Sequence, residues 1–135
     1  MTRTLTTAHV GTVREMTVYI PSHWWMTANQ RLHWAQKATR TRGVRDMAMI
    51  AARTHRLPGF DAAVITAWIQ YPTAGRADPS NAAPTVKAMV DGMVDAGVFA
   101  DDDSRHVIDG GCRRDAGACG RGWHRVRLVI AAVAP

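Results

Sequence analysis

Hydrophobic and polar residues alternate in distinct ways along the chain, and these patterns predict four strands. Residues 17–21 and 123–133 alternate between apolar and polar positions, which is typical of half-buried strands. Residues 62–71 are almost continuously apolar and rich in β-branched side chains, which favours a central strand. A short fourth strand is predicted at 105–109, and residues 110–122 are expected to form a glycine-rich loop.

Two segments show the spacing of amphipathic helices. Residues 34–56 lack proline and carry apolar residues at helical spacing, and residues 84–96 do so more regularly, at Val86, Met89, Val90, Met93 and Val94. Gly97 follows as a C-terminal cap. The order of elements predicts an α+β fold, a small mixed sheet of about four strands with two helices packed on it.

The length of 135 residues and a hydrophobic content of 47% indicate one compact domain, which we place at 16–135. Residues 1–15 show neither periodicity nor a cap, so we expect a flexible N-terminal arm there. The sequence contains neither an apolar stretch of about 20 residues nor a signal peptide, which predicts a cytoplasmic protein without membrane contact. Cys112 and Cys119 are expected to be free thiols.

The charge is uneven along the chain. The net charge is +6, and 15 of the 17 basic residues are arginine, the side chain best suited to forked contacts with phosphate. Both flanks are basic, whereas residues 58–110 contain eight aspartates and three basic residues. A solvated acidic surface would explain the aspartates. In a protein that binds a polyanion, clustered carboxylates also indicate a divalent cation between them and the phosphate.

The segment 75–104 carries spaced elements that resemble a known family. Asp78, Asn81, Lys87, Asp91 and the Asp101-Asp102 pair follow one another in the order seen in the RusA-type Holliday junction resolvases. TANQRLHW at 27–34 also resembles the N-terminal loop of that family, with Asn29 as its asparagine. The resemblance implies that Asp78 and Asp102 are metal ligands and that Lys87 is catalytic. The chain departs from this pattern in two ways: Ser80 stands where the best-known members have a second aspartate, and about three extra residues precede Lys87.

These observations predict a metal-dependent, structure-specific endodeoxyribonuclease that cleaves Holliday junctions with Mg²⁺ or Mn²⁺. The expected catalytic residues are Asp78, Lys87 and Asp102, and the expected metal ligands are Asp78, Asp91, Asp101 and Asp102. The resemblance implies a homodimer, and two symmetric cuts across a junction require two sites related by a twofold axis. The expected contacts to branched DNA are Asn29, Arg31, Lys37, Arg40, Arg45, Arg53, Arg76, Asn81, Arg125 and Arg127.

Several alternatives remain open at this stage. Lys87 and Asp91 would form an i, i+4 surface pair in any exposed helix. Ser80 is also consistent with a degraded metal site in a non-catalytic protein that binds branched DNA. An RNA-binding or assembly module of unrelated function would be favoured only if Asp78 and Asp102 lie far apart in space. Trp24 and Trp25 are candidates for a stacking platform at a DNA branch or for core packing. The C-x6-C spacing of the cysteines is not typical of a zinc site.

Overall fold

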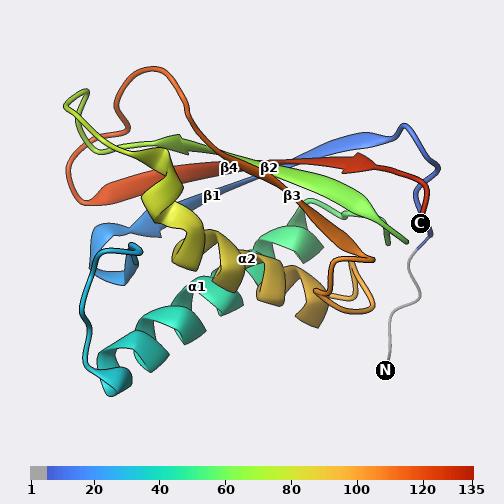
Figure 1. Ribbon diagram of the computed structural model, residues 1–135, viewed down its shortest axis with the longest axis horizontal. Helices are drawn as coiled ribbons and strands as arrows, with labels where there is room; N and C mark the ends of the chain where they lie inside the picture. Colours follow the sequence, from blue (N-terminus) through green and yellow to red (C-terminus); the bar gives the residue numbers. More distant parts are fainter. Residues whose placement is uncertain (1–5) are drawn as a thin grey trace.

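The computed structural model describes residues 6–135 and contains one four-stranded sheet covered on one face by two helices (Figure 1). The elements in chain order are β1 (Val13–Pro21), the 3₁₀ turn η1 (Ser22–Trp24), α1 (Trp34–Thr54), β2 (Ala63–Gln70), the 3₁₀ turn η2 (Pro79–Ala82), α2 (Ala83–Asp95), β3 (Val107–Arg114) and β4 (Trp123–Ala132). The predicted α+β class and the mixed sheet with two helices are therefore confirmed.

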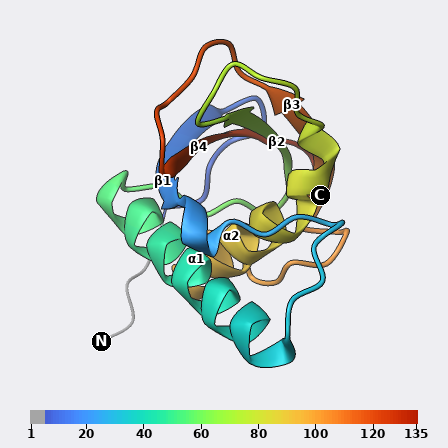
Figure 2. The same cartoon turned by 90° about the vertical axis from the view of Figure 1, so that its left-hand side faces the viewer.

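The strands lie in the order β1-β4-β2-β3. β4 pairs antiparallel with both β1 and β2, whereas β2 and β3 are parallel and are joined through α2. Side chains alternate strictly along β2 and β4, and the buried set faces the helices, with Ile69 and Leu128 fully enclosed. Figure 2 shows the sheet curving over α1 and α2, which places the core between the two layers.

The two helices touch closely at a glycine of α2. A Cβ atom built on Gly92 would lie 2.2 Å from the carbonyl oxygen of Arg45 in α1 and 3.0 Å from the Ala48 Cβ. Only a residue without a side chain allows this approach of the two backbones. The bidentate ion pair between Arg45 and Asp95, at 2.5 and 2.7 Å, joins the same helices one turn further along.

The strand boundaries correct two expectations. β1 begins at Val13, and the backbone N–H of Ala8 donates to the carbonyl of Gly59 at 2.7 Å, so residues 8 and 13–15 are held by the sheet and its connections rather than belonging to a free arm. Residues 1–5 of the expected arm lie outside the described residues. β3 continues to Arg114, into the segment expected to be a loop.

Glycine explains why β3 extends beyond its predicted end. The pairing of β2 with β3 shifts register between Ile65 and Ala67, which marks a bulge opposite Gly110 and Gly111. A Cβ on Gly110 would lie 2.4 Å from the Thr66 hydroxyl, and Gly111 has φ of +86°. The two glycines thus let the strand bend and continue, where the sequence pattern alone indicates a break. Within residues 6–135, no helix has both the length and the apolar character required to cross a bilayer.

Candidate active-site groove

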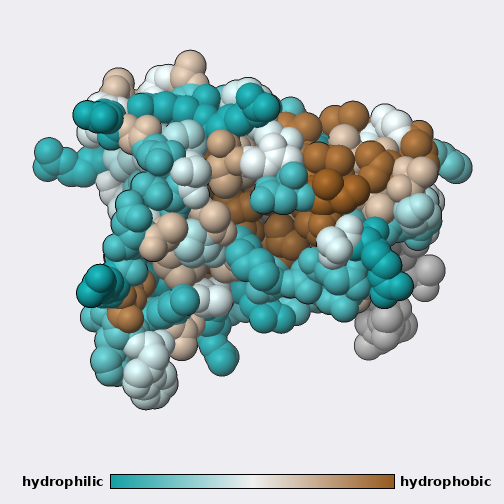
Figure 3. Space-filling view, in the orientation of Figure 1, coloured by the Kyte–Doolittle hydropathy of each residue, from teal (hydrophilic) through white to brown (hydrophobic). Residues whose placement is uncertain are grey.

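A groove of about 420 Å³ lies between α2 and the edge strand β3. Its walls are mostly apolar, and Figure 3 shows this brown surface in front of β2, β3 and α2. Four polar side chains from four separate segments line it: Ser80 from η2, Lys87 from α2, Asp102 from the turn after α2 and Asp109 from β3. We refer to this place as the α2–β3 groove.

Lys87 is held between two carboxylates at the groove. Its ammonium group donates to Asp91 at 2.7 Å, one turn further along the same helix, and also to Asp102. A helix of about 13 residues is ~20 Å long, so Asp102 meets Lys87 only because the chain turns back along α2 after Asp95. The predicted i, i+4 pair is thus present, and it forms part of a three-residue cluster.

The three charges stabilise one another. Hydrogen bonds from Lys87 lower the pKa of the Asp102 carboxyl to about 2, with a further contribution from Asp101. The same contacts, first with Asp102 and then with Asp91, raise the pKa of Lys87. The side chain of Lys87 is nevertheless 60% exposed. Asp102 is therefore ionised and Lys87 protonated throughout the neutral range, and the ammonium group is accessible to an incoming anion.

The remaining predicted carboxylates face other partners. The carboxylate of Asp78 accepts the Ser80 hydroxyl at 2.7 Å and the Ser80 backbone N–H at 3.1 Å, so it starts the turn η2 rather than lining the groove itself. Asp101 accepts the backbone N–H of Asp102 at 2.7 Å. Asp103 accepts a hydrogen bond from His106 at 2.6 Å. Of the three consecutive aspartates, only Asp102 lines the α2–β3 groove.

Asp109 is a groove residue that the sequence analysis did not select. It lies opposite Ile65 on the helix-facing side of β3, and its carboxylate accepts the backbone N–H of Gly111 at 2.7 Å. The sequence does contain a sign of this role, because Asp109 directly precedes the Gly110-Gly111 pair. Paired glycines in a strand favour a bulge, and bulges often redirect side chains beside functional sites. Because the predicted strand ends at residue 109, the sequence provides no pairing register with β2, and the direction of the Asp109 side chain cannot be predicted from it.

The donor set in the groove suits a small hard cation. Carboxylate and hydroxyl oxygens are the preferred ligands of Mg²⁺, which is usually held by one or two carboxylates together with water and substrate phosphate. Asp102 and Asp109 provide two such carboxylates in one groove. Among residues 6–135, no three His, Cys, Asp or Glu side chains converge as a preformed metal cage. The chemistry of Asp102 and Asp109 fits a Mg²⁺ ion whose remaining ligands are water and substrate phosphate.

The predicted DNA-binding residues fall into separate groups. Arg31 and Lys37 line a second hollow, of about 360 Å³, between the loop before α1 and the start of α2. Arg40 donates to the carbonyl of Trp25 at 2.8 Å, and Arg45 is the partner of Asp95. Asn81 is half-buried. Three further residues expected to contact DNA are exposed: Asn29, Arg53 and Arg76.

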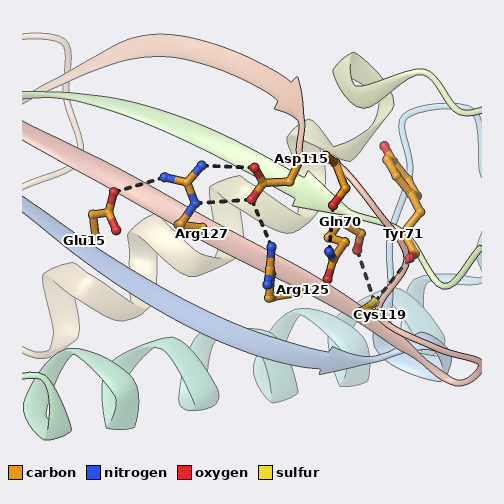
Figure 4. Close-up of polar contacts among 8 residues, drawn as sticks. Glu15, Gln70, Tyr71, Asp115, Cys119, Arg125 and Arg127 are labelled. Atoms are coloured by element: carbon orange, nitrogen blue, oxygen red, sulfur yellow. Dashed lines mark hydrogen bonds and ion pairs between the residues drawn. The ribbon is translucent and has the colours of Figure 1, made fainter. Parts of the chain in front are cut away.

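Arg125 and Arg127 lie on the opposite side of the sheet from the helices (Figure 4). Both donate to the carboxylate of Asp115, at 3.2 Å from Arg125 and 3.0 Å from Arg127, and Arg127 also reaches Glu15 at 3.0 Å. The two arginines were expected on a freely exposed strand face. Their side chains are only 27% and 28% exposed, because the extended β3 brings Asp115 over β4.

The structure decides between the alternatives for Trp25 in favour of core packing, and it confirms that the two cysteines are free. Trp25 is buried and stacks on His124 at 4.0 Å between ring centroids, and the ring of Trp24 packs over Gly43. Trp34 is instead the most exposed large apolar residue in the described part of the chain, at 76%. Cys112 lines the α2–β3 groove, whereas the Cys119 thiol donates to the Trp123 carbonyl at 3.1 Å, and both cysteines are free.

No protein-family model matches this sequence, and no curated protein is significantly similar to it.

Proposed function

We propose that the protein is a metal-dependent, structure-specific endodeoxyribonuclease that cleaves Holliday junctions and acts as a homodimer. The observation that carries this proposal is the convergence of Ser80, Lys87, Asp102 and Asp109 in the α2–β3 groove. Hydrolysis of a phosphodiester needs a cationic group beside the phosphate and oxygen ligands for a divalent ion. The resemblance of segment 75–104 to the RusA-type resolvases supports the same reaction and names the same lysine.

Lys87 is the residue that we assign to the scissile phosphate. Its ammonium group is shared between Asp91 and Asp102, and more than half of the side chain is exposed, so it can exchange one carboxylate contact for a phosphate oxygen. Negative charge grows on the phosphate oxygens in the transition state, and a fixed cation nearby stabilises that charge. Asp91 then acts as a positioning residue, because it keeps the ammonium group over the groove.

Asp102 and Asp109 would hold the metal ion, and Asp78, which is hydrogen-bonded to Ser80 of the groove, would be the third ligand. When bound, Mg²⁺ or Mn²⁺ supplies an activated water and stabilises the leaving oxygen. The carboxylate of Asp102 is ionised well below neutral pH, so it needs no deprotonation to serve as a ligand. Asp91 and Asp101 are turned toward Lys87 and toward the Asp102 backbone, which makes them supporting residues in this arrangement.

A cleavage assay tests the proposal. A labelled four-way junction is incubated with the protein in Mg²⁺, in Mn²⁺ and in EDTA, and linear duplex of equal length serves as the substrate control. We expect symmetric cuts in the junction with either metal ion and none in EDTA. Lys87→Ala should lower the cleavage rate about 100- to 1000-fold. Asp61→Asn removes one exposed charge outside the groove and should cleave like the parent. Metal-independent cleavage, or a Lys87→Ala variant of full activity, would refute the assignment.

A non-catalytic protein that binds branched DNA is the second candidate. It is favoured by one observation, the neutral Ser80 at the place where a carboxylate would complete the metal site. In this case the basic residues bind the junction and Lys87 is neutralised by Asp91 and Asp102. The assay above separates the two, because this candidate predicts junction binding without cleavage under every metal condition.

A further inference from the structure

The charged residues in the loop before α1 and in the first turn of that helix are all basic. Residues 26–37 contain two charged side chains, Arg31 and Lys37, and neither aspartate nor glutamate. We call residues 26–37 the basic loop. Figures 1 and 2 show this part of the chain extending beyond the sheet at one end of α1. An acid-free surface of this kind attracts a polyanion and repels a cationic partner.

The basic loop presents one large aromatic ring to solvent. Trp34 begins α1 and is 76% exposed, compared with 45% for Trp123 and 7% for Trp25. The side chain of His33 accepts the backbone N–H of Ala35 at 3.2 Å, so the residue before Trp34 caps the helix. The backbone of Trp34 therefore belongs to a capped helix and not to a free loop, and its ring is exposed at the start of that helix.

A hollow near the start of α1 has the size and charge for a phosphate-bearing segment. Lys37, which lines it, follows Trp34 by three residues in α1, so the two residues lie on the same side of the helix. The hollow measures about 360 Å³, and Arg31 and Lys37 are its two charged lining residues. Gln30 and the backbone around Thr27 provide further polar groups, while Leu32 and Pro84 close its apolar side. An aromatic ring near basic side chains is the usual arrangement for unpaired nucleotides, in which the base stacks and the backbone meets cations.

Hydrogen bonds tie the basic loop to the segment that carries Lys87. The backbone N–H of Ala28 donates to the carbonyl of Asn81 at 2.9 Å. The buried hydroxyl of Thr85 accepts from the Met26 N–H at 2.9 Å and donates to the Met26 carbonyl at 2.8 Å. Thr85 is two residues before Lys87 in α2. A DNA strand bound to the basic loop would thus lie at a fixed position relative to the α2–β3 groove.

We propose that Trp34 stacks on an unpaired base of branched DNA while Arg31 and Lys37 contact the flanking phosphates. Branch points are where bases become unstacked, and a linear duplex offers no such base along its length. The basic loop would therefore distinguish a junction from a duplex, a selectivity that the groove chemistry does not provide. This inference rests on the proposed function for its substrate, but it concerns binding and not cleavage.

Binding measured in EDTA tests the inference separately from catalysis. A fluorescently labelled four-way junction and a linear duplex of the same length are titrated with parent protein, Trp34→Ala, Trp34→Phe and the matched control Trp123→Ala. Loss of one stacked base should weaken junction binding about 5- to 150-fold in Trp34→Ala. Trp34→Phe should retain most of the affinity, and Trp123→Ala should resemble the parent. The affinity of each variant for the linear duplex should stay within about twofold of the parent protein's affinity.

Three binding outcomes overturn the inference, and comparison with the cleavage assay separates its failure from that of the proposed function. Unchanged junction affinity in Trp34→Ala excludes stacking, and an equal loss on junction and duplex shows that Trp34 does not select unpaired bases. A changed sedimentation coefficient without a change in DNA binding would assign Trp34 to a protein interface. If the parent never cleaves but the Trp34 effect is present, hydrolysis is refuted and the inference stands. If the parent cleaves and Trp34→Ala binds normally, the inference alone fails.

Discussion

The ammonium group of Lys87 contacts the carboxylate of Asp102 although 15 residues separate them in the chain. This contact exists because the segment after α2 reverses direction and runs back along the helix. The resemblance implies that Lys87 is catalytic and that Asp102 is a metal ligand. Both side chains line the α2–β3 groove.

Removal of the charge at Asp102 should separate cleavage from binding. Asp102→Asn and Asp78→Asn are expected to abolish cleavage of a four-way junction, while junction affinity stays equal or rises because a negative charge near phosphate is lost. Cleavage and binding are measured on the same preparations, with Asp61→Asn as the charge-matched control. Parental cleavage rates in either variant would show that the site is placed wrongly.

Position 80 should control the metal requirement. Serine offers a neutral oxygen, and neither Asp101 nor Asp103 lines the groove to replace the missing charge. We expect an enzyme that needs millimolar Mg²⁺, and Ser80→Asp should lower the concentration for half-maximal cleavage. Ser80→Ala should change it little. A metal titration of the three proteins measures this, and activity found only in Ser80→Asp would identify the natural protein as a non-catalytic binder.

The arginines should differ in their contribution to DNA binding. Arg53 is exposed on α1, whereas Arg127 is already ion-paired with Asp115 and Glu15. Loss of a true phosphate contact lowers the slope of log affinity against log salt by about 0.9. We therefore expect a smaller slope in Arg53→Ala and an unchanged slope in Arg127→Ala. The reverse result would move the DNA surface to the outer face of the sheet.

Burial of His124 should make stability depend on pH. Burial lowers the pKa of this imidazole to about 4, below its ordinary value of 6.5. The unfolded chain therefore takes up a proton before the folded protein does, so the unfolding free energy falls as pH decreases from about 6.5 to about 4. The slope is at most ~1.4 kcal/mol per pH unit. Urea unfolding at pH 7, 6 and 5 measures it, and His124→Phe, which keeps a ring against Trp25, should flatten the dependence.

Because the two helices are in close contact at Gly92, the stability of the protein should be sensitive to a single methyl group added at this position. A Cβ there would lie 2.2 Å from a backbone oxygen, which cannot move as a side chain does. Overpacking outweighs the gain in helix propensity, and we expect Gly92→Ala to lower the unfolding free energy by about 2 kcal/mol. Gly75→Ala, where the nearest atom lies at 3.4 Å, is the matched control and should be almost neutral. Equal stability of the two variants would contradict the packing described.

The sequence predicted those parts of the molecule that local patterns determine. The apolar stripe from Val86 to Val94 places α2 within one residue of its observed ends, and the alternation after Trp123 places β4 equally well. The groove was only partly predictable. Lys87 and Asp102 were selected from the resemblance, whereas Asp109 depends on a parallel register that a glycine bulge sets. The pairing of Arg127 with Asp115 likewise depends on two strands that are distant in sequence.

The position of β4 has a consequence for biosynthesis. This strand lies between β1 and β2, yet it is the last of the four along the chain. β1 therefore emerges from the ribosome more than 100 residues before β4, the strand with which it pairs. Until β4 is synthesised, the apolar side chains of β1 have no strand beside them, and the sheet cannot close. We expect folding to follow completion of β4, with the nascent chain dependent on chaperones until then.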